Sequence, residues 1–209
     1  MAAEKVKKTF SETRIYPVFF MIIITLIFVG ILATFYQLTI ERVTEYRDLK
    51  LKETVLQLFD LPTQNSEAEF SEFITKREKN DIQYYEAVQD SILLGFCFPI
   101  RGKGLWGTID ALIALSADLS QIIKLEIISQ NETPGLGGRI TENWFKDQFQ
   151  NKIIISDEIV QYFQLIPEEE KTAANQINQI TGATASSKAV ADMISRNVKI
   201  ILAETGGEL

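Results

Sequence analysis

The chain has 209 residues and a formal net charge of −7, with no His and a single Cys. This composition argues against a structural zinc site, which needs about four Cys or His ligands, and it excludes a general acid or base of the histidine type. The acidic balance argues against nucleic-acid binding, because phosphate contacts require a basic surface. Cys97 has no partner for an intrachain disulfide, and its apolar neighbours, SILLGFCFPI, indicate a buried thiol.

The first predicted element is a membrane-spanning helix, because residues 15–40 contain no charged side chain. As a helix, this stretch would extend roughly 39 Å, against a hydrocarbon core of about 30 Å. A cleaved signal peptide is the alternative, but its apolar region is usually about 7–15 residues long. We therefore predict a retained anchor at 16–39. Four Lys and Arg precede the apolar stretch and four follow it closely, so the charges alone leave the orientation open.

The segment after the anchor predicts a helical connector at 40–82. Residues 41–59 have apolar side chains at roughly helical spacing, and Pro62 ends that helix. Residues 62–80 indicate a loop followed by a short helix whose charges run from acidic to basic, as suits a helix dipole.

From residue 83 the chain becomes rich in aromatic and apolar residues, which favour strands. Strand-like stretches lie at 84–88, at 91–100 and at 108–129, the last as two strands joined around residues 117–119. The stretch TENWFKDQF predicts a helix with Thr141 as its N-cap. KIIIS and YFQLI are short strand candidates, and the acidic run PEEEK indicates a solvated face.

The last element is an amphipathic helix, since Val190, Ile194, Val198 and Ile201 recur on one face. The expected fold class is α+β, a mainly antiparallel sheet with packed helices preceded by one N-terminal transmembrane helix. The expected organisation is a short tail (1–15), the anchor (16–39), the connector (40–82) and a domain spanning 83–209.

Three loops rich in glycine or hydroxyl groups could bind a ligand, at 101–107, 131–138 and 181–187. In the second, Pro134-Gly135 suits a type II turn, and Gly137 and its neighbour allow a close approach of the backbone. Taken singly, each loop is more simply explained as a well-formed turn.

The third loop, TGATASS, lies where a strand-like stretch meets the last helix. A helix N-terminus offers unpaired N–H groups and a positive dipole end, which suit a phosphate. The alternative is that Thr184 or Ser186 only caps the helix, which needs one hydroxyl rather than several.

In combination, KGLWGT, ETPGLG and TGATAS resemble three motifs that occur in this order in a family of FMN-binding subunits. These are the C subunit of the sodium-translocating NADH:quinone oxidoreductase (Nqr) and the G subunit of the Rnf ferredoxin:NAD complex. The similarity extends from about Ser91 to Ala203, and the short chain is more similar to the Rnf protein.

The resemblance implies that a separate flavin transferase esterifies the FMN phosphate to the Ser186 hydroxyl, with Ser187 as the fallback acceptor. The chain departs from the motif in having Ser rather than Thr as the acceptor and Asn178 where Asp is usual. The remaining residues of the implied recognition motif are Thr181, Gly182, Ala183 and Thr184.

The resemblance further implies a membrane-anchored flavoprotein that relays electrons among the other membrane subunits of an ion-translocating oxidoreductase, with its domain outside the cytoplasmic membrane and its short tail inside. No metal and no catalytic side chain is expected. Leu105 and Trp106 could form an apolar wall for the flavin ring, and the turn from Gly135 through Leu136 to Gly137 would supply backbone donors. Glu132 and Thr133 complete the implied cofactor-binding residues.

Two further observations limit what this chain does in such a complex. NADH binding is not expected, because no G-x-G-x-x-G follows a strand, and an uncharged single span cannot form an ion path alone. Two alternatives stay open: an anchored sensor that holds FMN or another phosphate ligand, and a structural assembly protein without a redox role.

Overall fold

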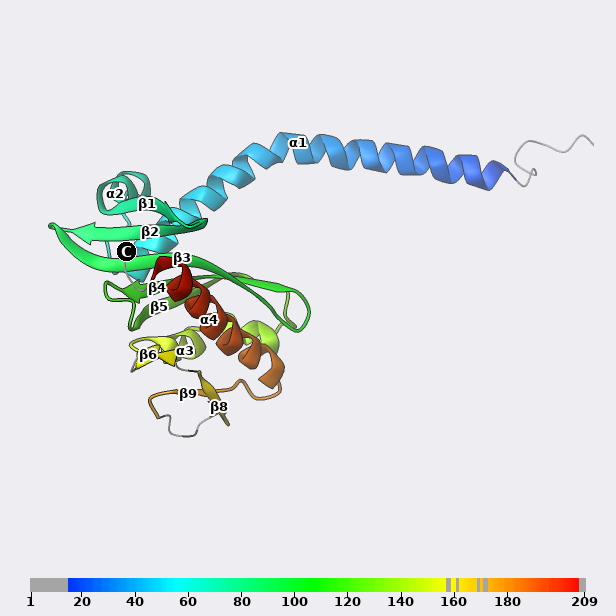
Figure 1. Ribbon diagram of the computed structural model, residues 1–209. Helices are drawn as coiled ribbons and strands as arrows, with labels where there is room; N and C mark the ends of the chain where they lie inside the picture. Colours follow the sequence, from blue (N-terminus) through cyan, green and yellow to red (C-terminus); the bar gives the residue numbers. More distant parts are fainter. Residues whose placement is uncertain (1–14, 157–158, 161, 169, 171–172, 207–209) are drawn as a thin grey trace, which may run out of the picture. The chain divides into compact units, whose positions relative to one another are not determined.

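The computed structural model describes residues 15–156, 159–160, 162–168, 170 and 173–206. It divides into two compact units, Met1–Asp48 and Leu49–Leu209, with the boundary inside helix α1 (Tyr16–Leu58). Every strand in the described part of the chain lies in the second unit (Figure 1).

Helix α1 confirms the predicted apolar helix and extends it without interruption to Leu58. Among the described residues it is the one helix long and apolar enough to cross a membrane. The large apolar side chains of its predicted membrane-spanning part are exposed, Leu26 and Phe35 each by 67%. The Thr34 hydroxyl donates to the carbonyl oxygen of Gly30 at 2.8 Å, which satisfies this polar group without water. These properties suit a helix surrounded by lipid.

The second unit is built on an antiparallel sheet, as predicted, and the sheet has five strands in sequence order. Each strand pairs with the next along the chain, so every connection within the sheet is a short turn. The strands are β1 (Ile74–Lys79), β2 (Ile82–Gln89), β3 (Ile92–Lys103), β4 (Thr108–Ser116) and β5 (Ile122–Ser129).

Strand β1 corrects one expectation, since the segment ITKREK was expected to be helical. Helix α2 occupies only Ser66–Phe73, and the chain then pairs with β2 over the whole of β1. Arg77 forms an ion pair with Glu86 across the two strands, at 2.9 Å. Pairing with a neighbouring strand overrides the local charge pattern, because five of the six β1 residues are exposed and impose no helical stripe.

The predicted helix at 141–149 is also partly wrong. Three short helical segments take its place, and Thr141 ends the first of them instead of capping a helix: its hydroxyl donates to the carbonyl oxygen of Gly138 at 3.0 Å. Glu142 precedes the second segment without a side-chain cap. The segments are η2 (Gly137–Thr141), α3 (Asn143–Lys146) and η3 (Asp147–Phe149).

The remaining strands are short and lie apart from the main sheet. They confirm strands inside KIIIS and YFQLI, although each covers only part of the predicted stretch. The two pairs are antiparallel β6 (Ile155–Ser156) with β7 (Ile159–Val160), and parallel β8 (Gln164–Ile166) with β9 (Gln176–Asn178).

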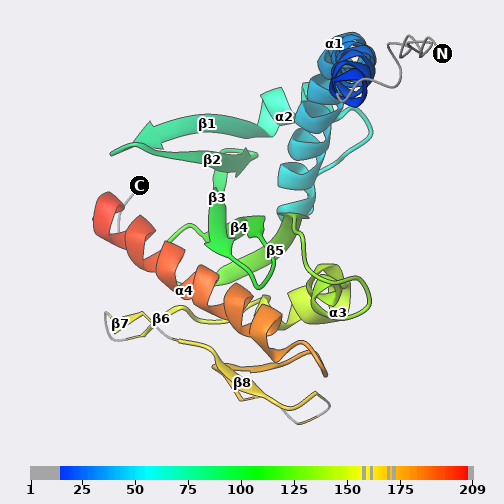
Figure 2. The same cartoon turned by 90° about the vertical axis from the view of Figure 1, so that its right-hand side faces the viewer.

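The central strands of the main sheet are buried on both faces, and alternate residues of β3 show this. Phe96 and Phe98 belong to a core formed with α4 (Thr184–Thr205), whereas Cys97 belongs to a second core formed with α2 and the last turns of α1. Figure 2 shows α4 lying across the first face. Cys97 is fully buried, as predicted.

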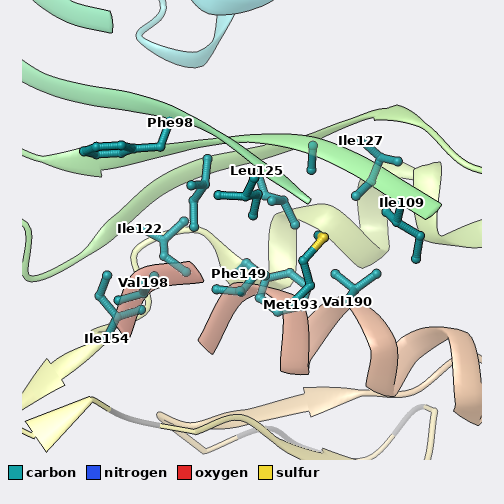
Figure 3. Packing of buried hydrophobic residues seen from close by; sticks show 14 of the residues in the cluster. Phe98, Ile109, Ile122, Leu125, Ile127, Phe149, Ile154, Val190, Met193 and Val198 are labelled. Atoms are coloured by element: carbon teal, nitrogen blue, oxygen red, sulfur yellow. The ribbon is translucent and has the colours of Figure 1, made fainter. Parts of the chain in front are cut away.

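Helix α4 confirms the predicted amphipathic face, since Val190, Ile194, Val198 and Ile201 are each at most 3% exposed. Val190 and Met193 point from α4 toward the strands, where Leu125 and Ile127 meet them (Figure 3). Each such side chain contributes about 1.5–3 kcal/mol by leaving water. This packing fixes the start of α4 beside the loops at one end of the sheet.

Candidate functional site

Helix α4 begins at Thr184, two positions after Gly182 of the TGATASS loop, and no side chain caps it. The N-cap residue is Ala183, and no side chain accepts a capping hydrogen bond from the N–H groups of the first turn. The interpretation of Thr184 or Ser186 as a simple helix cap is therefore wrong. The N–H groups of the first turn stay available to another acceptor.

The two adjacent serines of this loop have different environments. Ser187 is fully buried, and its hydroxyl accepts the N–H of Ile180 at 2.9 Å and donates to the carbonyl oxygen of Ala183 at 3.1 Å. These contacts make Ser187 part of the backbone turn that leads into α4. Ser186 makes no such contact with the turn; its hydroxyl donates instead to the carboxylate of Glu132, at 2.5 Å.

Glu132 joins all three loops that the sequence singled out. One carboxylate oxygen accepts the Ser186 hydroxyl, from a residue 54 positions away. The other oxygen accepts the N–H groups of Leu105 at 2.9 Å and Trp106 at 3.1 Å. Glu132 is 4% exposed and Ser186 is 1% exposed. The arrangement is therefore a buried carboxylate whose charge is offset by backbone and hydroxyl donors.

The turn after Glu132 has the predicted geometry. The carbonyl oxygen of Thr133 accepts the N–H groups of Leu136 at 3.1 Å and Gly138 at 2.9 Å. Gly135, following Pro134, has a φ of 74°, as a type II turn requires.

The same turn passes directly against the Ser186 hydroxyl. A Cβ atom added to Gly137 would lie 2.4 Å from the Ser186 oxygen and 2.9 Å from the Glu132 oxygen that accepts the Ser186 hydroxyl. Only glycine fits this approach without a shift of the neighbouring atoms.

Large apolar side chains are exposed around these loops. Leu105 is 57% exposed, Trp106 is 69% exposed and Leu136 is 46% exposed. Leu136 reaches the start of the TGATASS loop, where its Cδ2 atom lies 3.2 Å from the position of a Cβ added to Gly182. The surface beside Ser186 is therefore suited to an apolar ligand.

Two residues that the sequence did not indicate hold the beginning of the TGATASS loop. Glu168 accepts the N–H of Thr181 at 2.7 Å, and Arg139 donates to Glu168 at 3.2 Å. The Thr181 N–H, the Thr181 hydroxyl and Arg139 lower the pKa of Glu168 to about 2. The run PEEEK was expected to be a solvated face, and no local pattern marks Glu168 as the residue that makes these contacts.

The position at which the motif usually has Asp serves a structural purpose in this chain. The side-chain amide of Asn178 donates to the carbonyl oxygens of Pro167 at 2.8 Å and Glu170 at 3.0 Å. A carboxylate has no hydrogen to donate to either of them. The amide therefore ties β9 to the segment that carries Glu168.

Residues 104–199 match the model of the FMN-binding domain. This segment belongs to the FMN-binding family. The chain is 31% identical over 125 residues to the G subunit of a proton-translocating ferredoxin:NAD(+) oxidoreductase complex from Clostridium ljungdahlii, which covers 60% of this chain and 63% of that protein. It is 30% identical over 124 residues to the C subunit of the Na(+)-translocating NADH-quinone reductase of Pseudomonas aeruginosa. That alignment covers 57% of this chain and 47% of the Pseudomonas protein.

The fold of the FMN-binding domain also has a counterpart among solved structures. The crystal structure of the C subunit of the Na(+)-translocating NADH-quinone reductase from Parabacteroides distasonis aligns with a TM-score of 0.62 at 21% identity, covering 79% of this chain and 94% of that one. The fold is therefore shared. The matched part of this chain spans about half to two thirds of the length of the curated relatives named above.

The structure of the FMN-binding domain brings together most of the residues singled out in the sequence. Leu105, Trp106, Glu132, Gly137 and Ser186 meet at one place, linked by the contacts of the Glu132 carboxylate. The side chains of Thr133, Thr181 and Thr184 are also exposed around this place.

Proposed function

We propose that this chain is a membrane-anchored flavoprotein that carries FMN covalently on Ser186 and relays electrons as one subunit of a redox-driven, ion-translocating oxidoreductase complex. The observation that carries the proposal is the meeting of the three loops at the Ser186 hydroxyl, on the uncapped first turn of α4. Ser187 is the weaker candidate, because both of its hydrogen-bonding functions are already used by the backbone.

The residues around Ser186 suit a flavin nucleotide. A phosphate on Ser186 would lie at the N-terminal end of α4, where N–H groups and the helix dipole stabilise an anion. The exposed side chains of Leu105, Trp106 and Leu136 would pack against the apolar ring. When bound, FMN supplies the electron chemistry, while the protein binds and orients it.

The residues of the loops divide between the two parts of the cofactor. The segment Thr181–Thr184, with Gly182 and Ala183 between them, would form the sequence that a flavin transferase recognises. The turn from Thr133 through Gly135 to Gly137 would present its backbone to the ring. No acid or base of the chain is required, which agrees with the absence of His.

The complex is proposed to be of the Rnf type, because the matched segment covers 63% of the Clostridium protein but 47% of the Pseudomonas protein. The chain would span the cytoplasmic membrane once at 16–39, with the tail 1–15 inside and the domain 83–209 outside, joined by the connector 40–82. The other membrane subunits would exchange electrons with the flavin and provide the ion path.

Mass spectrometry of the chain tests the covalent bond. Full-length protein made together with its flavin transferase should gain the mass of one FMN minus water, and should fluoresce as a flavin in a denaturing gel. Ser186→Ala should lose both signals, and Ser187→Ala should keep them. A native protein without flavin would favour the structural assembly protein, and freely exchangeable FMN would favour the sensor.

Labelling in intact cells tests the proposed side of the membrane. Glu72 is exposed on α2, and the native Cys97 is buried, so Glu72→Cys provides one reactive thiol. A membrane-impermeant maleimide should label this variant in intact cells. Labelling only after lysis would place the domain in the cytoplasm and contradict the proposal.

A further inference from the structure

The hydroxyl proposed to accept the flavin is closed off by its neighbours. Ser186 is 1% exposed, its proton is donated to Glu132 at 2.5 Å, and Gly137 lies across its oxygen. The cover is formed by residues 132–138, the cover segment.

The closed arrangement is incompatible with phosphoryl transfer for steric reasons. The attacking oxygen and the phosphorus must approach to about 3–3.5 Å before the bond forms. Between the Ser186 oxygen and Gly137 there is not enough room for a single added carbon, which would lie at 2.4 Å. A phosphate group is larger than a methyl group and therefore cannot enter on this side.

The charge of the site also opposes the entry of a phosphate. Glu132 is a buried carboxylate next to the acceptor oxygen, and a nucleotide phosphate is an anion. Like charges repel more strongly where water is excluded. The nearby cation Arg139 is already engaged by Glu142 and Glu168, each at 3.2 Å, and does not offset this repulsion.

We propose that Glu132 is a positioning residue that controls access to Ser186: it holds the cover segment closed over the acceptor, and FMN is attached to a form in which this segment has moved away. The inference rests on the proposed function, namely covalent attachment at Ser186. In the step itself, the Ser186 oxygen bonds to the FMN phosphorus of a flavin dinucleotide. The phosphoanhydride bond to the AMP leaving group breaks, and the hydroxyl proton passes to solvent.

Attachment also removes the contact that held the segment closed. An esterified Ser186 oxygen has no proton to donate to Glu132, and the new phosphate repels the carboxylate. The cover segment can move as a unit, because its turn is held internally by the Thr133 carbonyl oxygen. The modified domain therefore keeps the segment displaced from its original position.

The rate of flavin attachment to the purified full-length apoprotein tests this inference. The protein in detergent is mixed with flavin transferase and flavin dinucleotide, and the initial rate is followed by in-gel flavin fluorescence and intact mass. In Glu132→Gln a neutral amide replaces the charged acceptor and holds the segment less strongly, so the rate should rise on the order of tenfold. The final mass should equal that of the wild type.

Gly137→Ala is a second variant that acts on the same cover by a different means. The backbone at Gly137 is outside the left-handed region, so its conformation is open to Ala, but the methyl group would collide with Ser186 and push the segment away from it. This variant should also react faster. Asp118→Asn is the matched control. The Asp118 carboxylate also accepts a backbone N–H and a hydroxyl, but in the turn at the opposite end of β4. The rate of flavin attachment to this variant should equal that of the wild type.

Hydrogen exchange of the apoproteins gives a readout that does not depend on the transferase. Peptides containing residues 132–138 should exchange faster in both site variants than in the wild type, while peptides from β3 and β4 should not change. Thermal unfolding curves of each variant confirm that the domain is folded.

The outcomes separate the inference from the function on which it rests. If wild type is modified at Ser186 but Glu132→Gln reacts at the same rate or more slowly, the cover is not limiting and the inference is overturned. If flavin attachment is slower in Glu132→Gln and unchanged in Gly137→Ala, the carboxylate assists the transfer and does not restrict access to Ser186. If Ser186→Ala still gains the flavin, the proposed function itself fails.

Discussion

The two ends of strand β4 show two ways of closing a connection between neighbouring strands. At the β4–β5 end, Asp118 accepts the N–H of Ser120 at 3.1 Å and the hydroxyl of Ser116 at 2.5 Å, so the turn is closed by its own side chains. At the β3–β4 end, the N–H groups of Leu105 and Trp106 depend on Glu132, which lies 26 or 27 positions further along the chain.

The difference separates a turn that serves only the fold from one that takes part in a site. A locally closed turn can form as soon as its strands pair. The β3–β4 loop has one hydrogen bond of its own, from the N–H of Gly104 to the carbonyl oxygen of Gly107 at 2.7 Å. The N–H groups of Leu105 and Trp106, however, find their acceptor only when Glu132 has packed beside them. The candidate site uses the second kind of loop, which leaves Leu105 and Trp106 exposed for a ligand.

The largest stability effect is expected at the Glu132 end. Glu132→Ala removes the acceptor of two backbone N–H groups and one buried hydroxyl, and should lower the free energy of unfolding by about 3 kcal/mol. Urea titration of the apoprotein measures this. If Glu132→Ala lowers the free energy of unfolding no more than Asp118→Asn does, the proposed difference between the two ends of β4 is wrong.

A smaller loss is expected at the start of α4. Ser187→Ala leaves the N–H of Ile180 without its acceptor in the interior, which should cost about 1–3 kcal/mol while flavin attachment is retained. Ser195→Ala is a matched control in the same helix, because its buried hydroxyl only donates to the carbonyl oxygen of Ala191. Equal losses in the two variants would show that the Ile180 contact adds nothing.

At the opposite end of β4, Asp118→Asn should lower the free energy of unfolding by only about 1 kcal/mol, because the turn is exposed to water and keeps one acceptor oxygen. The same urea titration applies. Flavin content of the variant made with the transferase should match that of the wild type, and a reduced content would connect this turn to the site.

The smallest effect concerns acid stability at the start of the TGATASS loop. The Thr181 N–H, the Thr181 hydroxyl and Arg139 lower the pKa of Glu168 from 4.5 to about 2. A lowered pKa means that the folded state favours the carboxylate, so its contribution is present above pH 4.5 and is lost as the pH falls toward 2. Glu168→Gln should therefore show a flatter decline of the melting temperature between these pH values. Parallel curves for the two proteins would contradict the assignment.

Much of the fold follows from local patterns. The apolar and aromatic runs of β3 and β4 predict strands, which the structure buries on both faces, and the stripe of Val190, Ile194 and Val198 predicts the covering helix. β1 could not be predicted in this way, because its exposed charged residues carry no period and only pairing with β2 makes the segment a strand. Residues 141–149 break into short helical segments because no cap or regular apolar stripe sustains a single helix.

The sequence by itself determined the apolar span, the types of most elements and the three motifs that mark the candidate site. Only the tertiary structure decided which of the two serines is bound into the backbone turn, and that Glu132 joins loops as far apart as residues 105 and 186. Periodicity and capping act within a few residues, so a sequence displays them directly. A hydrogen bond between segments 54 residues apart exists only after the sheet and α4 have packed, and no local pattern records it.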